Sequence, residues 1–410
     1  MVVMLPTPTD NGARLAAILP TGLACLAPAL GSTAADALDL AFAGAPVPAG
    51  DPAPLPELPE LRSLVLIVVD GLGHANLQER AGHARTILSM PGRRIETVAP
   101  STTGAALTTL TTGRLPGSHG LIGYRIRHPE LGLVTTLRDW DGIEPIRSWQ
   151  RAEPLFGLAG RMGARPLAIG RPAHADGGLT RAILSDAEYL GGQRIEDRFA
   201  LASQAVRGPD PVLAYLYIDE LDKAGHEQGW GSDAWLARLE QFDAALDGFL
   251  RGLPGGVGVV LTADHGMVDV PQHGQIVLDE DPIPGVALIG GEPRFRSLYL
   301  EDGADPESVA REVESRLGKL AWVGTRDAAI ADGWFGETGA DVVPRLGEVL
   351  VAARKQVAFT LRGDDPRALA MVGQHGSLSA EERGIPLRLG GALAGSGFAS
   401  ALARVADRVR

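Results

Sequence analysis

Cysteine is almost missing from this sequence of 410 residues, which contains only Cys25. A single cysteine cannot form a disulfide bond within the chain, and it cannot build a cysteine-based metal cluster. Any metal site must therefore be made from histidine, aspartate, glutamate or hydroxyl side chains.

An excess of basic residues is also absent, because the formal net charge is −12 at pH 7. A protein that binds along a nucleic-acid backbone needs basic residues to neutralise the phosphates, so this charge argues against a nucleic-acid scaffold. A small anionic substrate is compatible with it, since a local cation or metal ion reverses the sign of the field inside one pocket.

The sequence has no hydrophobic run long enough to span a bilayer comfortably. The apolar stretch 15–30 is interrupted by Pro20 and Pro28, and Arg14 is the only positive side chain ahead of it. We expect a helix that packs on the domain, in a cytoplasmic protein. The alternative is a cleaved signal and a secreted or periplasmic protein. The Pro-rich stretch "GAPVPAGDPAPLPELPELR" is typical of a surface linker, which would end an N-terminal unit of residues 1–62.

Short apolar runs alternate with helical patterns in residues 63–270, which we interpret as the first part of a catalytic core. The run "SLVLIVVDG" is continuous and β-branched, as expected for a strand buried on both faces. A pattern with helical period spans residues 233–253. The alternation predicts an α/β fold with a mostly parallel central sheet flanked by helices. The expected strands lie within 63–71, 94–103, 164–170, 211–220 and 256–266.

The pattern changes in residues 271–345, which we interpret as a smaller α+β insertion. "RFRSLYLE" alternates like an edge or half-exposed strand. The helix after it is signalled by Asp305 at the N-cap and Pro306 at the first helical position. We expect the chain to return to the core at "LGEVLVAA" and to complete it with residues 346–410.

Polar side chains that suit metal binding or nucleophilic attack follow several of the expected strands. In an open α/β sheet, ligands bind outside the carboxyl ends of the strands. Each group has a plainer interpretation, as a turn, an exposed i,i+4 pair, a helix N-cap or a loop histidine. Their shared position at strand ends favours one common site. These side chains are Asp70; Ser101, Thr102 and Thr103; Asp222 and His226; Asp264 and His265; and His375.

The motifs "VVDG", "PSTTGAALTTLTTGRLPGSHG", "DKAGH", "TADHG" and "GQHG", in this order, resemble those of the alkaline phosphatase superfamily. The sequence is most similar to the nucleotide pyrophosphatase/phosphodiesterase branch, where the nucleophile segment lies nine residues ahead of a Thr-Gly-x-x-Pro-x-Ser-His-Gly segment. Here the second segment starts at Thr112, and Thr103 lies nine residues before it. The resemblance covers about residues 63–385, apart from the insertion, and implies an alkaline-phosphatase-like fold.

The resemblance implies two divalent metal ions, usually Zn²⁺, with Mn²⁺ as the alternative. Histidine and carboxylate ligands without cysteine suit either metal. It also implies that Thr103 is the nucleophile at the start of a helix, because metal coordination lowers the pKa of a hydroxyl. Thr102 is the nearest rival, and Ser101 is a candidate helix cap. Carried over by position, the ligands of one metal are Asp70, Asp264, His265 and Thr103, and those of the other are Asp222, His226 and His375.

Two positions depart from the pattern of that branch. The lysine before the nucleophile is replaced by Thr102, and the asparagine 21 residues after it, which binds a phosphoryl oxygen, is replaced by Tyr124. A tyrosine hydroxyl donates one hydrogen bond, and Arg125 adds positive charge beside it. We therefore expect Thr102, Tyr124 and Arg125 to bind substrate.

The implied protein is a dimetal hydrolase that forms a phosphothreonine intermediate, which water then releases. The preferred substrate is a small phosphodiester or a nucleotide pyrophosphate. Alternatives in the same superfamily are a phosphomonoesterase, a phosphonate hydrolase and a sulfatase. A catalytically inactive metal-containing binding protein is the alternative outside the enzymes, and the intact Thr103 argues against it. The leaving group, the native metal and the oligomeric state stay open at this point.

Overall fold

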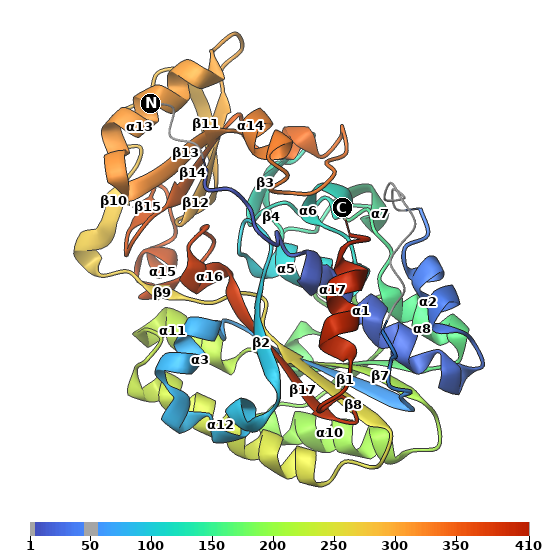
Figure 1. Ribbon diagram of the computed structural model, residues 1–410. Coiled ribbons are helices and arrows are strands. Elements are labelled where there is room, and N and C mark those ends of the chain that lie inside the picture. The colour runs from blue at the N-terminus through green and yellow to red at the C-terminus, as the bar shows by residue number, and fades with distance from the viewer. Residues whose placement is uncertain (1–4, 45–55, 410) are drawn as a thin grey trace.

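The computed structural model describes residues 5–44 and 56–409. Its largest element is a seven-stranded sheet (Figure 1). Five neighbouring strands are parallel, and β17 runs antiparallel to both of its neighbours, β8 and the edge strand β2. The predicted α/β fold with a mostly parallel sheet is confirmed.

Most of the predicted Pro-rich linker, residues 45–55, lies outside the described residues. In sheet order the strands are β2 (Gly92–Glu96), β17 (Gly384–Gly391), β8 (Val257–Thr262), β1 (Ser63–Val69), β7 (Val212–Ile218), β5 (Arg165–Gly170) and β6 (Glu188–Gly191).

The centre of this sheet is the apolar run that begins at Ser63. All seven residues of β1 are buried, and β7 and β8 flank it with Leu66 opposite Tyr215 and Val260. Branched aliphatic side chains suit a strand that is packed on both faces. Because β8, β1, β7, β5 and β6 run in the same direction, their carboxyl ends meet at one edge of the sheet.

Helices cover both faces of the central sheet (Figure 1). The helices on one face are α1 (Ala13–Leu26), α2 (Ala34–Ala41), α5 (Thr103–Thr112), α8 (Leu155–Met162) and α17 (Phe398–Ala406), and those on the other are α3 (His74–Glu79), α4 (Arg85–Ser89), α10 (Ile195–Arg207) and α12 (Asp233–Arg251). The remaining short helices of the core are α6 (Pro116–His119), α7 (Ile146–Trp149), α9 (Gly178–Ile183), α11 (Glu220–Gln228), α15 (Pro366–Leu369) and α16 (Ala380–Arg383).

The N-terminal apolar stretch forms α1, which lies beside α17 and also contacts α2 and α5 (Figure 1). Every residue from Leu15 to Leu26 is buried. Pro20 lies inside the helix and lacks an amide hydrogen. The next residue, Thr21, adds a bond of its own, from its Oγ1 to the Ala17 carbonyl at 2.7 Å. Among the described residues, no helix is both long and apolar enough to cross a membrane.

A second, smaller sheet stands apart from the central one and has its own apolar core under α13 (Pro306–Leu317). Asp305 caps α13 as predicted, because its side chain accepts a hydrogen bond from the Ser308 amide at 3.1 Å. The strands in sheet order are β11 (Val286–Glu292), β12 (Phe295–Leu300), β14 (Val349–Ala353) and β13 (Ala321–Thr325), and α14 (Arg326–Ala331) follows β13. The two-stranded ribbons are β10 (Gln275–Val277) with β15 (Ala358–Thr360), β16 (Gly373–Gln374) with β9 (Val268–Asp269), and β3 (Arg125–His128) with β4 (Gly132–Thr135).

The predicted return to the core at "LGEVLVAA", and with it the boundary at residue 346, is wrong. This segment forms β14, which pairs with β12 and β13 in the small sheet rather than with the central sheet. A strand in the middle of either sheet is buried on both faces and has the same apolar composition, so its sequence does not say to which sheet it belongs. The chain rejoins the central sheet only at β17.

The prediction of an edge strand for "RFRSLYLE" is also wrong. β12 lies between β11 and β14, and its residues Phe295 to Tyr299 are buried. The alternation came from two arginines that are buried as ion pairs, Arg294 with Glu382 and Arg296 with Asp364. The sequence does not show whether an arginine is exposed or buried in an ion pair, so the alternating pattern suggested exposure.

Candidate active site

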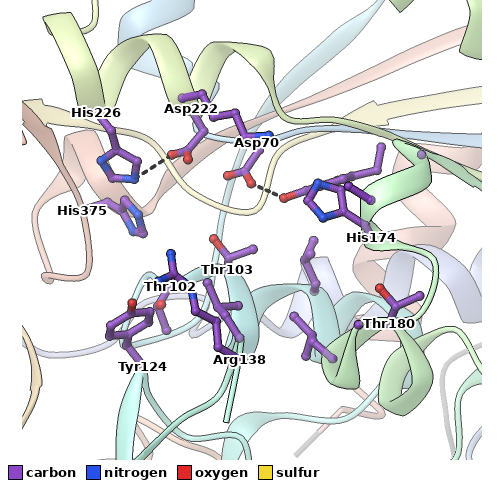
Figure 2. Close-up of a pocket in the computed structure, with 18 of the residues that line it drawn as sticks. Asp70, Thr102, Thr103, Tyr124, Arg138, His174, Thr180, Asp222, His226 and His375 are labelled. Carbon is purple, nitrogen blue, oxygen red and sulfur yellow. Dashed lines mark hydrogen bonds and ion pairs between the residues drawn. The ribbon is translucent and has the colours of Figure 1, made fainter. Parts of the chain in front are cut away.

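The predicted metal ligands and the predicted nucleophile gather beyond the carboxyl edge of the central sheet. Figure 2 labels five of them, Asp70, Thr103, Asp222, His226 and His375. Asp70 follows β1, Asp264 and His265 follow β8, and Thr103 is the first residue of α5. Because β1 and β8 are neighbouring parallel strands, Asp70 and Asp264 emerge side by side. The Gly71 amide donates a hydrogen bond to Asp264 Oδ1 at 3.2 Å and joins the two strand ends.

Asp70, Asp264 and His265 form one group of candidate metal ligands, with ligand atoms within 4.8 Å of one another. His265 Nε2 lies 3.3 Å from Asp70 Oδ1 and 3.4 Å from Asp264 Oδ2. The same nitrogen lies 3.1 Å from Thr103 Oγ1. The four residues that the resemblance assigned to one metal therefore converge on one point.

Asp222, His226 and His375 form a second group that meets the same distance criterion. Asp222 and His226 lie four residues apart on α11, a spacing that places both on one face of a helix. His226 Nε2 lies 3.2 Å from Asp222 Oδ1. His375 follows β16, and its ring stacks on that of His265 with 3.5 Å between the ring centroids. The two groups therefore adjoin.

All three histidines are oriented in the same way. Their Nδ1 atoms lie within hydrogen-bond distance of backbone carbonyl oxygens, which directs the Nε2 atoms into the site. Such a bond holds the tautomer in which Nε2 has a free lone pair, as a metal ligand requires. The pairs are His226 with Gly373 at 2.7 Å, His265 with Gly266 at 3.1 Å and His375 with Ser101 at 2.9 Å.

Each of the three aspartates has a buried oxygen that lacks a hydrogen-bond partner in the described part of the chain, although Asp222 as a whole is only half-buried. Asp70 Oδ1, Asp222 Oδ1 and Asp264 Oδ2 make no hydrogen bond of ordinary geometry within the described residues. Burial raises the pKa of Asp70 well above its ordinary value, and the charges of Asp264 and Asp222 raise it further. Burial also raises the pKa of Asp222 to about 6 and lowers the pKa of His265 to about 3. A divalent cation would stabilise this arrangement of buried carboxylates and neutral imidazoles, so the residues fit a metal site.

The start of α5 presents Thr103 to this site, as predicted. Thr102 is the N-cap residue, but its side chain makes no capping bond, and Ser101 does not cap the helix either. Ser101 Oγ instead donates a hydrogen bond to the Ser377 carbonyl at 2.8 Å, which ties the helix start to the loop of His375. Because no capping side chain accepts a hydrogen bond from the first backbone amides of α5, these amides are free to bind an anion.

A cavity of about 880 Å³ opens beside Thr103. Of the three residues expected to bind substrate, Thr102 and Tyr124 line it and Arg125 does not. Arg125 is the first residue of β3, and neighbouring residues of an extended chain point to opposite sides. Arg138 and Arg367 do line the cavity, and Figure 2 shows Arg138 beside Thr102 and Tyr124.

The cavity has a second, apolar wall formed by the start of α5, the end of β5 and the segment of α9. Aliphatic side chains dominate this wall, and the aromatic rings of Tyr189 and Tyr215 continue it. The aliphatic side chains are those of Leu107, Leu137, Ile169, Leu179, Ile183 and Leu184.

Sequence reasoning missed three residues that touch the site. The Tyr217 hydroxyl donates a hydrogen bond to Asp70 Oδ2 and orients this ligand. Its position in β7, next to β1, was the available signal. Arg138 and Glu292 line the cavity from segments without any motif, so that only the fold reveals them.

The family model for type I phosphodiesterase / nucleotide pyrophosphatase matches residues 64–378. This chain belongs to that family. Among curated proteins, the phosphodiesterase-family chain is similar to ectonucleotide pyrophosphatase/phosphodiesterase family member 1 of Rattus norvegicus, with 26% identity over 188 residues. The match covers 43% of this chain and 20% of that relative, so the common region spans about a fifth of the relative's length.

Two solved structures share the fold of this phosphodiesterase-family chain. One is murine ectonucleotide pyrophosphatase / phosphodiesterase 5, an inactive threonine-to-alanine form in complex with AMP, with a TM-score of 0.61 and 19% identity over 79% of this chain and 87% of that chain. The other is phosphonoacetate hydrolase from Sinorhizobium meliloti 1021 in complex with phosphonoformate, with a TM-score of 0.61 and 19% identity over 88% of this chain and 100% of that chain. Both likenesses confirm the alkaline-phosphatase-like architecture.

Proposed function

We propose that this chain is a dimetal hydrolase of phosphodiester or nucleotide pyrophosphate bonds, with Thr103 as the nucleophile. The observation that carries the proposal is the position of Thr103 Oγ1, 3.1 Å from His265 Nε2, where two groups of candidate metal ligands adjoin. Membership of the family supports the reaction class. The inactive threonine-to-alanine form of the murine neighbour supports a threonine nucleophile, and the AMP bound to it supports a nucleotide among the substrates.

We propose Zn²⁺ for both metals, with Mn²⁺ as the alternative, because the donors are imidazoles and carboxylates without thiolates. When bound, the two ions would neutralise charge on the phosphoryl oxygens and lower the pKa of the Thr103 hydroxyl. The residues that would hold them are Asp70, Asp264, His265 and Thr103 for one ion and Asp222, His226 and His375 for the other.

In the proposed reaction the Thr103 oxygen forms a bond to phosphorus while the bond from phosphorus to the leaving oxygen breaks. The Thr103 hydroxyl gives up its proton to solvent, the leaving group departs with its electron pair, and a phosphothreonine is formed. Water then attacks this phosphothreonine and restores the Thr103 hydroxyl. The free amides at the start of α5 bind the non-bridging oxygens, and Arg138, which lines the cavity beside Thr102, adds a charged donor.

The size and lining of the cavity favour a diester or pyrophosphate over a small phosphonate. A phosphoryl group needs only a small part of about 880 Å³, and the remaining space ends at an apolar wall. Such a wall takes up the organic group of an ester, because burying its apolar surface is favourable. A phosphonate with a single short carboxylate arm, by contrast, would leave the wall unoccupied.

A panel of substrates tests this proposal. We expect zinc-loaded protein to hydrolyse a nitrophenyl phosphodiester or a dinucleotide faster than nitrophenyl phosphate or phosphonoacetate, and elemental analysis to find two metal ions per chain. Faster turnover of phosphonoacetate would make the chain a phosphonate hydrolase. The absence of any turnover in protein that holds both metals would favour the metal-containing binding protein.

The cytoplasmic location stays a proposal. Relatives that are called ectonucleotide pyrophosphatases lend it no support. The argument for it is that α1 is buried between α5 and α17, so that a cleavage after Ala34 or Ala35 would remove a part of the core. N-terminal sequencing of the mature protein tests it, and a chain that begins after these alanines would show an exported protein.

A further inference from the structure

The hairpin between β11 and β12 brings the small sheet into the catalytic cavity. β11 ends at Glu292 and β12 begins at Phe295, so Pro293 and Arg294 form the tip. Glu292 and Pro293 both line the cavity that contains Thr103. Glu292 is therefore the point at which the insertion reaches the proposed reaction centre.

The tip is held in place by the buried carboxylate of Glu382. Arg294 donates to it twice, from Nε to Oε1 and from Nη2 to Oε2, each at 2.7 Å. The Ser377 amide donates to the same carboxylate at 3.0 Å, and Ser377 lies two residues after the candidate ligand His375. One carboxylate therefore fixes both the hairpin tip and the metal-ligand loop, and a bidentate arginine pair of this kind holds a defined geometry.

Glu292 lies against the glycine of that loop. A Cβ atom at Gly376 would lie 2.5 Å from Glu292 Cδ, so only glycine leaves room for the carboxyl group. The Glu292 side chain is buried, with 6% of the residue exposed. Its Oε1 has no hydrogen-bond partner within the described residues, and no cation forms an ion pair with it there. The neighbouring Arg296 is engaged with Asp364.

A buried oxygen without a partner, such as Glu292 Oε1, favours the neutral form of the carboxyl group, which keeps a hydroxyl hydrogen to donate. Burial raises the pKa of Glu292 well above its ordinary value, and the charge of Glu382 raises it further, whereas Thr102 and Arg296 oppose the shift only in part. The residues nearest to it in the cavity are Thr102 and Tyr124, on the side of Thr103 away from Asp222.

We propose that Glu292 is a specificity-determining residue, whose carboxyl group donates a hydrogen bond to a non-bridging phosphoryl oxygen of the substrate. This inference rests on the proposed function. A neutral donor adds no positive charge, so it suits the single negative charge of a diester better than the double charge of a monoester. The insertion thereby contributes directly to the choice of substrate.

Two variants of similar size test the donor. Glu292→Gln keeps a hydrogen-bond donor and the shape of the side chain, whereas Glu292→Leu fills the space without one. We expect kcat/KM for a nitrophenyl phosphodiester to stay within about threefold of the parent in the Gln variant and to fall about 10- to 100-fold in the Leu variant. Glu301→Ala, an exposed glutamate at the end of β12, is the matched control and should change nothing.

Binding of inorganic phosphate separates this proposal from the proposed function, because it requires no turnover. In zinc-loaded protein, calorimetry should give a phosphate affinity about tenfold weaker for the Leu variant and unchanged for the Gln variant. Equal affinities in all variants, or an equal loss in Gln and Leu variants with full metal content, would overturn the role of Glu292. Lack of diester turnover in the parent protein, with phosphate binding still dependent on Glu292, would overturn only the assigned reaction.

Discussion

Ser101, Thr102 and Thr103 are consecutive at the start of α5, and single substitutions distinguish the two candidate nucleophiles, Thr102 and Thr103. Thr103→Ala should lose nearly all turnover, about a thousandfold or more, because the attacking oxygen is gone while Asp70, Asp264 and His265 still bind metal. Thr103→Ser should keep part of the activity, since a hydroxyl stays on the same Cβ. Thr102→Ala should cost on the order of tenfold through a lost substrate contact. Steady-state kinetics with metal analysis measure all three.

The reverse order of effects would move the nucleophile by one residue. If Thr102→Ala were inactive and Thr103→Ala active, the match of this segment to the family pattern would be shifted. Full activity in both variants would contradict the covalent mechanism and favour direct attack by water.

Arg138 lines the cavity and the predicted Arg125 does not, so the two arginines give a second test in which Arg125 is the control. Arg138→Ala should raise KM for a phosphodiester about tenfold or more, because a charge-assisted hydrogen bond to the phosphoryl group is lost. Arg125→Ala should leave KM within about twofold, since Arg125 does not line the cavity. The opposite result in steady-state kinetics would restore the assignment made from the sequence.

Site residues that belong to motifs were predictable from the sequence. Site residues that tertiary structure brings in from segments without a motif were not. Asp70 and Asp264 each follow an apolar strand pattern, so the sequence places them at one sheet edge, whereas His375 follows β16, outside the central sheet, and was assigned through the resemblance. Arg138 and Glu292 have no such pattern, because their positions depend on a hairpin and on an inserted sheet. The substrate contact was therefore assigned to Arg125, because it is next to Tyr124 in the sequence.

At the scale of elements, the packing of α1 can be tested through its only thiol. Cys25 is fully buried, and burial raises its pKa to about 12. At pH 8 the reactive thiolate is therefore scarce as well as inaccessible. We expect iodoacetamide to leave native protein unmodified for hours and to label one site after denaturation, as read by intact-mass spectrometry. Rapid labelling of native protein would show that α1 does not pack on α5 and α17.

The same scale shows which elements a sequence specifies. β1 and α13 were found because a continuous apolar run and a capping pattern are local properties. The assignment of β14 failed because sheet membership is decided by pairing partners that are distant in sequence. The alternating pattern around β12 misled for a related reason, since ion pairs with Glu382 and Asp364 allow Arg294, just before the strand, and Arg296, within it, to be buried.

For the whole molecule, the two ligand groups predict that metal and stability are linked. Removing metal with a chelator should lower Tm by several degrees, and adding Zn²⁺ should restore it, because an ion that binds only the folded chain at 100 times its Kd adds about 2.7 kcal/mol. Asp222→Asn should weaken the second site and reduce the recovery. Thermal melts with elemental analysis provide the measurement, and an unchanged Tm in protein shown to gain two ions would contradict the linkage.

The buried contact between Arg294 and Glu382 also limits how this protein can be rebuilt. The small sheet is separate from the central sheet and has its own apolar interior. Yet its hairpin tip shares one carboxylate with the loop of His375. In a chimera, replacing the small sheet by that of a relative would also replace Arg294, which holds Glu382 and, through it, the loop of His375. The Arg294 and Glu382 positions would therefore have to be exchanged together.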